Sequence, residues 1–176
     1  MNIVVNAALF QVVWFATVAG AGAGFWWTGL PALAVFVAWQ LRSSRWPRAD
    51  LVLLGCGVLL GLILDSLLIA GGWLRFASPQ PSPQFAPIWI LVLWAGFALT
   101  VNHSLAFLKH RPLLALAFGA LGGPLAYLGA ERLFAAVAFT APPTQVLGAL
   151  AIAWAIAMPL LAAVACRLVD REARPA

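Results

Sequence analysis

The chain has 176 residues, of which 64% are hydrophobic and 9% are charged, and its formal net charge at pH 7 is +5. A soluble domain carries about 25% charged residues, so this chain could not solvate its own surface in water. Apolar runs recur along its whole length, which indicates a single polytopic membrane domain over residues 1–176. Lys and Arg lie at the ends of these runs without forming a basic stripe, so no nucleic-acid partner is expected.

The apolar runs predict an all-α bundle of six transmembrane helices. No Lys or Arg precedes the first run, and a second run follows it at once, which favours a retained span over a cleaved signal peptide. The alternating Gly and Ala residues at 19–24 predict a tight turn between the first two spans. The predicted spans cover residues 3–19, 25–41, 51–74, 88–108, 113–139 and 146–168.

Basic residues sort to one side of these six spans. The loop after the second span, the loop after the fourth span and the C-terminal tail would share that side, while the opposite loops hold only Arg75. Because cytoplasmic loops are enriched in Lys and Arg, both termini are predicted to be cytoplasmic. The residues on the basic side are Arg42, Arg45, Arg48, Lys109, Arg111, Arg167, Arg171 and Arg174.

Three charged residues fall in the outer half of the predicted spans. Glu131 and Arg132 lie in the outer half of the fifth span, and Asp65 lies at a similar depth in the third. Such residues normally face protein or a water-filled cavity, so we predict that Asp65 and Arg132 are buried together. A structural role in fixing helix register, a ligand site and a proton path all remain open for this pair. Glu131 is also compatible with an ordinary interfacial charge.

Four-residue spacing indicates which faces of the third and fifth helices meet. Small residues on these faces would let the two backbones approach closely, and the Tyr127 hydroxyl could donate to the Glu131 carboxylate one turn away. Asp65, Tyr127, Glu131 and Arg132 therefore form the candidate in-membrane polar site. The two faces consist of Gly57, Gly61 and Asp65, and of Gly119, Gly123, Tyr127 and Glu131.

The middle of the fifth span contains a predicted helix break at Gly122, Gly123 and Pro124. Proline removes a backbone donor and kinks helices. The first half of the chain has no good counterpart of this break, which weakens the interpretation as an inverted-repeat transporter.

A second polar layer is predicted near the cytoplasmic face. It consists of Asn6, Gln11, Gln40, Asn102 and His103, with Gln11 lying deeper than the others. The interpretation of His103 as a hydrogen-bonded packing residue is favoured over a catalytic one. Trp14, Trp94 and Trp154 fall at mid-span, where packing is favoured over ligand stacking.

No catalytic constellation is recognisable in the sequence. The two cysteines, Cys56 and Cys166, lack paired or metal-ligand spacing, and His110 lies in a loop without partners. No metal or cofactor is therefore expected. The expected partners are the lipid bilayer and, in addition, a membrane protein or a lipid ligand.

Several local patterns resemble domain-of-unknown-function family 2878, whose members are small multispan inner-membrane proteins of Gram-negative bacteria. The most specific are Asn102-His103-Ser104 and the stretch Gly-Gly-Pro-Leu-Ala-Tyr at 122–127, and further matches cover most of the chain in order. The resemblance implies an inner-membrane location, a multispan topology and a lipid-related task. It carries no established activity, so no catalytic role is transferred.

Three functional hypotheses follow. The first is a non-enzymatic membrane component linked to lipid or envelope processes. The second is a small transporter or lipid flippase in which Asp65, Glu131 and Arg132 line a polar path. The third is an intramembrane lipid-modifying enzyme with His103 or Asp65 as acid or base, which would require His103 to lie beside a carboxylate or a metal.

Overall fold

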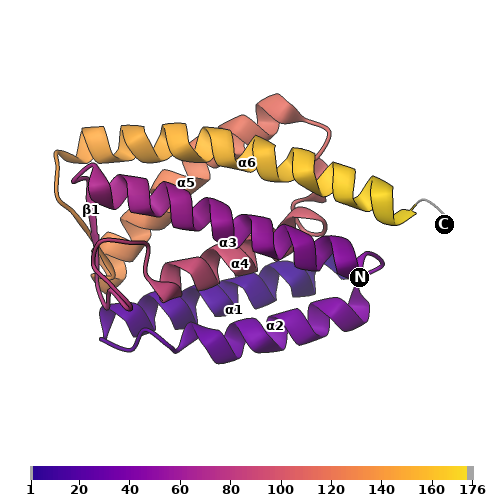
Figure 1. The fold of residues 1–176 in the computed structure, drawn as a ribbon, viewed down its shortest axis with the longest axis horizontal. Helices are drawn as coiled ribbons and strands as arrows, with labels where there is room; N and C mark the ends of the chain where they lie inside the picture. The colour runs from indigo at the N-terminus through magenta and orange to yellow at the C-terminus, as the bar shows by residue number, and fades with distance from the viewer. Residues whose placement is uncertain (1, 174–176) are drawn as a thin grey trace.

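The structure, a computed structural model, describes residues 2–173 and is predominantly α-helical (Figure 1). Within this range, α1, α3, α5 and α6 are each long and apolar enough to cross a membrane. The helical character predicted from the sequence is therefore confirmed. The helices are α1 (Ile3–Gly22), α2 (Gly29–Ser43), α3 (Pro47–Ala70), α4 (Ile88–Val101), α5 (Pro112–Phe134) and α6 (Pro143–Ala173).

The centre of the bundle is α4, the shortest of the six helices. Every residue from Trp94 to Val101 is buried, because α1, α2, α3 and α6 all pack around this helix. Its 14 residues rise about 21 Å, which is less than the thickness of a bilayer core. The predicted span 88–108 is thus too long. The rest of the predicted span is a turn and a short 3₁₀ helix, η1 (Ala106–Leu108). Backbone that is not α-helical is tolerated at membrane depth where other protein segments surround it.

Two short strands connect the ends of α3 and α5. Strand β1 (Leu74–Phe76) pairs antiparallel with β2 (Val137–Phe139), and Leu74 lies opposite Phe139. The predicted spans 51–74 and 113–139 had assigned Leu74 and the whole of β2 to helices. Instead α5 ends at Phe134, where Ala135 adopts a left-handed backbone conformation with φ 51°. The strands satisfy each other's backbone groups at the end of the bundle, where the chain reverses direction.

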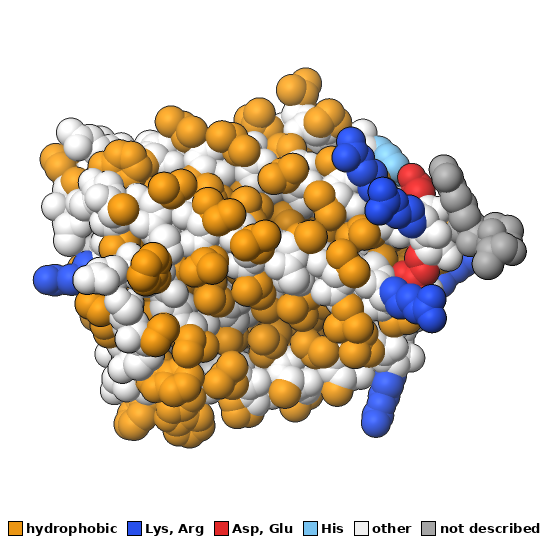
Figure 2. Space-filling view, viewed as in Figure 1, with side chains coloured by type: hydrophobic (Ala, Val, Ile, Leu, Met, Phe, Trp, Pro, Cys, Tyr) orange, Lys and Arg blue, Asp and Glu red, His pale blue; other side chains and the backbone are white. Residues whose placement is uncertain are grey.

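Charge and hydrophobic surface are separated along the long axis of the bundle. Figure 2 shows apolar side chains over the middle, and Lys and Arg gathered at one end. That end is where α1 begins and α6 ends, and we call it the basic end (Figure 1). The opposite end shows much less positive charge on this face. Arg174, which the sequence also assigns to the basic side, lies outside the described residues.

Candidate functional site

Asp65 is fully buried in the middle of the bundle and joins three helices. Its Oδ2 accepts a hydrogen bond of 2.7 Å from Trp94 Nε1 on α4, and its Oδ1 accepts one from the Tyr127 hydroxyl on α5. Gly61, one turn earlier on α3, makes this contact possible, because a Cβ there would overlap the Trp94 ring. Two donors thus satisfy a carboxylate that would otherwise be costly at this depth.

The predicted pair between Asp65 and Arg132 is wrong. Arg132 is exposed at the end of α5, whereas Asp65 is 0% exposed, and their side chains share no ion pair in the described chain. Glu131 is also separate from Tyr127, because its Oε1 accepts from the backbone N–H of Phe139 at 3.3 Å. The candidate site of four residues therefore reduces to Asp65 and Tyr127. The charges of Glu131 and Arg132 belong to the turn into β2.

The glycine faces also meet different partners from those predicted. A Cβ on Gly57 would lie 2.7 Å from Ala98 Cβ, so this face of α3 packs on α4 instead of α5. Gly119 and Gly123 contact Trp154 on α6. The predicted break is absent as well: α5 continues through Gly122, Gly123 and Pro124 as one helix. Gly119 and Gly123 thus serve the packing of α5 against α6.

The double-mutant cycle of Asp65→Asn and Arg132→Gln should be additive. Arg132→Gln is expected to change the free energy of unfolding by less than about 0.5 kcal/mol, because the side chain is exposed. The double variant should then match Asp65→Asn within about 0.5 kcal/mol, since the two residues share no partner. Unfolding in one detergent provides the measurement. A coupling energy above about 1 kcal/mol would show that the two side chains do interact.

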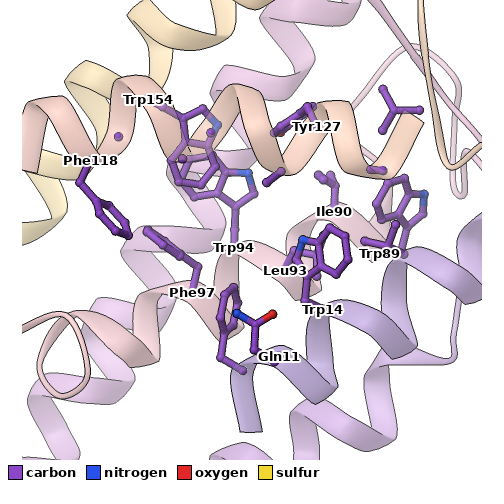
Figure 3. Close-up of a pocket in the computed structure, with 18 residues that line it drawn as sticks. Gln11, Trp14, Trp89, Ile90, Leu93, Trp94, Phe97, Phe118, Tyr127 and Trp154 are labelled. Carbon is purple, nitrogen blue, oxygen red and sulfur yellow. The ribbon is translucent and has the colours of Figure 1, made fainter. Parts of the chain in front are cut away.

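A cavity of about 290 Å³ is bounded by α1, α4, α5 and α6, and its lining includes Trp94 and Tyr127 but not Asp65 (Figure 3). Trp94 stacks on Trp154 with ring centroids 4.4 Å apart, and both rings form part of the cavity wall. The donors of Trp94 and Tyr127 are occupied by Asp65, so they present apolar surface to the cavity. The lining includes Gln11, Trp14, Trp94, Phe118, Tyr127 and Trp154.

The cavity connects the core to the outer surface of the bundle. Its wall includes the buried Trp94 and Tyr127, and also the exposed Gln11 and Phe118. Gln11 is therefore not part of the second polar layer but lies beside the cavity. An apolar cavity reached from a hydrocarbon-facing surface has the chemistry to hold an apolar chain.

A hydrogen-bonded network at the basic end is built around a second buried carboxylate, Asp50. Its Oδ2 lies 2.8 Å from His103 Nε2 and accepts from Gln40 Nε2 at 3.1 Å. Its Oδ1 accepts from Asn102 Nδ2 at 2.9 Å, and Lys109 Nζ donates to Asn102 Oδ1 at 3.2 Å. Within residues 2–173, the contact between His103 and Asp50 is the only one at salt-bridge distance, and it is an ion pair only when the imidazole is protonated.

Asn6 extends this network to α1. Its Nδ2 donates to Gln40 Oε1 at 3.0 Å and to the Leu99 carbonyl at 3.2 Å, and its Oδ1 accepts from Ser104 Oγ at 2.6 Å. Gln40 Nε2 also reaches the Leu99 carbonyl at 3.3 Å. Four of the five residues predicted for the second layer, Asn6, Gln40, Asn102 and His103, thus lie in one cluster. The cluster fixes the C-terminal end of the short helix α4.

Sequence reasoning missed Asp50, because it was assigned to the basic loop before the third span. A signal was available: Pro47 occupies the start of α3, and proline favours the first helical position. Starting the helix there puts Asp50 on the same face as Gly57, Gly61 and Asp65. His103 does lie beside a carboxylate, as the enzyme hypothesis required, but that carboxylate is Asp50 instead of Asp65.

Comparison with protein families gives a match that covers most of the chain. The family described as "Protein of unknown function (DUF2878)" matches residues 3–160. No curated protein and no solved structure matches the chain significantly. The match spans α1 to α5, the first part of α6, both buried carboxylates and the apolar cavity. This chain therefore belongs to the DUF2878 family, as the resemblance of its local patterns indicated.

Proposed function

We propose that this protein is a multi-pass protein of the bacterial inner membrane that holds a lipid chain in the cavity between α1 and α5, as a non-enzymatic component of a lipid or envelope process. The observation that carries this proposal is the apolar lining of a cavity that reaches the outer surface of the bundle. Its volume of about 290 Å³ is just below the range of about 300–1,000 Å³ for small-molecule sites. A single hydrocarbon chain is a ligand of suitable shape and polarity.

The hydrogen bonding around the cavity supports an apolar ligand over a polar one. Asp65 does not line the cavity, and Trp94 and Tyr127, which do, direct their donors at its carboxylate. A transporter for a polar solute would need several exposed polar groups along its path. Among the described residues that line the cavity, Gln11 is the one with an amide side chain, and none is charged. The flippase alternative shares the lipid ligand but requires a polar route for the head group. A membrane-protein partner that receives or delivers the lipid is compatible with the proposal.

The distribution of charge supports six crossings with both termini in the cytoplasm. Lys and Arg gather at the basic end, where α1 begins and α6 ends (Figure 2). The positive-inside rule places that end on the cytoplasmic side. We expect a C-terminal fluorescent-protein fusion to fluoresce and a C-terminal alkaline-phosphatase fusion to be inactive in bacteria. The reverse pattern would contradict this topology, and a phosphatase fusion after Arg75 provides the control for the outer side.

Filling the cavity should prevent the binding of a lipid chain. Gly122 lines the cavity, and a Cβ there would meet only Phe118 at 3.9 Å, so Gly122→Leu can place its side chain in the cavity without displacing the core. Gly148→Leu is the matched control, because Gly148 is exposed on α6 and has no neighbour within 4 Å. The measurement is photocrosslinking with a phospholipid that carries a diazirine in its acyl chain, followed by peptide mapping.

We expect crosslinks to the cavity peptides of α1 and α5 in the unmodified protein. In Gly122→Leu these crosslinks should fall by at least about tenfold, which corresponds to about 1.4 kcal/mol of lost affinity, whereas Gly148→Leu should retain them. Crosslinks that are spread evenly over all exposed apolar helix faces, or that persist in Gly122→Leu, would contradict a lipid site in the cavity.

A further inference from the structure

A second cavity, of about 280 Å³, lies at the basic end beside the Asp50 network. It is lined by Ile3, Arg45, Trp46, Asn102, His103 and Ala106. It thus combines apolar surface from α1 and η1 with an imidazole, an amide and a guanidinium. None of these residues lines the apolar cavity between α1 and α5, so the two sites can be considered independently.

The Asp50 carboxylate determines which nitrogen of His103 is available to a ligand. A carboxylate only accepts hydrogen bonds, so His103 Nε2, which lies 2.8 Å from Asp50 Oδ2, must carry the proton and donate it. In residues 2–173 no hydrogen bond reaches His103 Nδ1, and this atom is not fully buried. Nδ1 is therefore accessible from the cavity that His103 lines. A hydroxyl group suits it, because a hydroxyl can both donate and accept a hydrogen bond.

Two cations lie at this cavity or contact its lining. Arg45 lines the cavity, and its guanidinium carbon lies 5.0 Å from the centroid of the Trp46 ring. Stacking on an aromatic face orients a guanidinium, which can then bind a phosphate with two hydrogen bonds. Lys109 adds a second cation at Asn102, another residue of the lining. No acidic residue lines the cavity, and the nearby carboxylate of Asp50 is fully buried and occupied by its three donors.

We propose that the cavity at the basic end binds a phosphate ester that carries a neighbouring hydroxyl group, with the phosphate on Arg45 and the hydroxyl on His103 Nδ1. Asp50 is a positioning residue in this site, because it holds the imidazole ring and its tautomer without facing the ligand. Both a lipid head group, such as phosphoglycerol, and a soluble phosphate ester have this chemistry. The apolar Ile3 and Ala106 beside the polar groups favour the head group of a lipid.

The test is a competition between two anionic lipids in the full-length detergent-purified protein, read by native mass spectrometry. Phosphatidylglycerol carries the phosphate and hydroxyls, whereas phosphatidylmethanol with the same acyl chains has the same charge and no hydroxyl. Since the chains are identical, binding in the apolar cavity cannot produce a preference. We expect about threefold to tenfold more phosphatidylglycerol to be retained, which is the effect of one hydrogen bond. Glycerol phosphate at millimolar concentration is added in a separate arm.

Matched variants assign the two contacts. Arg45→Gln should lower the retention of both lipids about threefold, whereas Arg42→Gln, an exposed arginine outside the lining, should not. His103→Phe should remove the preference for phosphatidylglycerol, whereas His110→Phe should not. If His103→Phe fails to fold, the lipid preference and the Arg45 variant still decide the question.

Each outcome of the competition is informative. Displacement of phosphatidylglycerol by glycerol phosphate would support the site with a soluble ester as its ligand, and a lipid preference without displacement would support the site with a lipid head group. Equal retention of the two lipids by the unmodified protein would overturn the proposal. Equal retention by Arg45→Gln and Arg42→Gln would also overturn it.

Discussion

Asp50→Ala should lower the free energy of unfolding by about 3–5 kcal/mol, the largest loss that we expect from any single polar substitution in this protein. Asp50 is 0% exposed, and three side chains, Gln40, Asn102 and His103, direct hydrogen bonds at it. Alanine leaves Asn102 Nδ2 and His103 Nε2 without an acceptor, and Gln40 Nε2 keeps the Leu99 carbonyl but loses the carboxylate. An unsatisfied buried donor costs about 1–3 kcal/mol, and water entering from the cavity at His103 keeps the total below the largest sum of these costs.

The matched control for this substitution is Asp170→Ala. Asp170 is an exposed aspartate near the end of α6, at the same end of the bundle, so its removal changes the net charge equally. We expect a change within about 0.5 kcal/mol for this variant. Unfolding of both variants in one detergent, followed by tryptophan fluorescence, gives the comparison. Similar stabilities for the two variants would mean that the network around Asp50 does not hold the bundle together.

The positions of the helices were predictable because each helix corresponds to a long run of apolar residues. The apolar runs marked α1, α3, α5 and α6, and prolines begin α3, α5 and α6. The exceptions are segments whose structure depends on neighbours. Residues 137–139 are as apolar as the helix that precedes them, and residues 74–76 hold Arg75 between two apolar residues, so neither segment is recognisable as a strand from its own sequence. Their conformation is set by pairing with each other across more than sixty residues of chain.

The polar site was only partly predictable, because sequence spacing gives depth along a helix and not the identity of its neighbour. Asp65, Glu131 and Arg132 were all expected in the outer half of the membrane, and the long arginine side chain was expected to be able to reach Asp65. The packing of α3 on α4 brought Trp94 to Asp65 instead. For Asp50 the missing information was local: the arginines around it indicated a loop, although Pro47 indicated a helix start.

The two buried carboxylates have related roles at different depths of α3. They are 15 residues apart, which is about 22 Å along the helix. Asp50 joins α3 to α2 and to the end of α4, and Asp65 joins α3 to α4 and α5. Each therefore fixes α4 to its neighbours at one level. The apolar and polar cavities lie beside these two levels, so the carboxylates also hold the walls of both proposed binding sites.

Gly119→Ala should separate α5 from α6 and lower the free energy of unfolding by about 2–3 kcal/mol. A Cβ at this position would overlap the backbone carbonyl oxygen of Trp154 and lie 2.9 Å from Met158 Cβ. A backbone atom cannot rotate out of the way as the end of a side chain can, so the two helices must move apart. Gly148→Ala is the matched control, since a Cβ there has nothing within 4 Å. It should be neutral, or stabilising by up to about 1 kcal/mol, because alanine favours the helix.

The same substitution connects packing to the proposed lipid site. Trp154 stacks on Trp94, which both lines the cavity and donates to Asp65. Movement of α6 would therefore displace the cavity wall, so acyl-chain crosslinking should fall in Gly119→Ala and remain unchanged in Gly148→Ala. Equal stability of the two variants would show that the close contact of α5 with α6 is absent in the membrane. A destabilised Gly119→Ala protein with normal crosslinking would place the lipid chain elsewhere on the bundle.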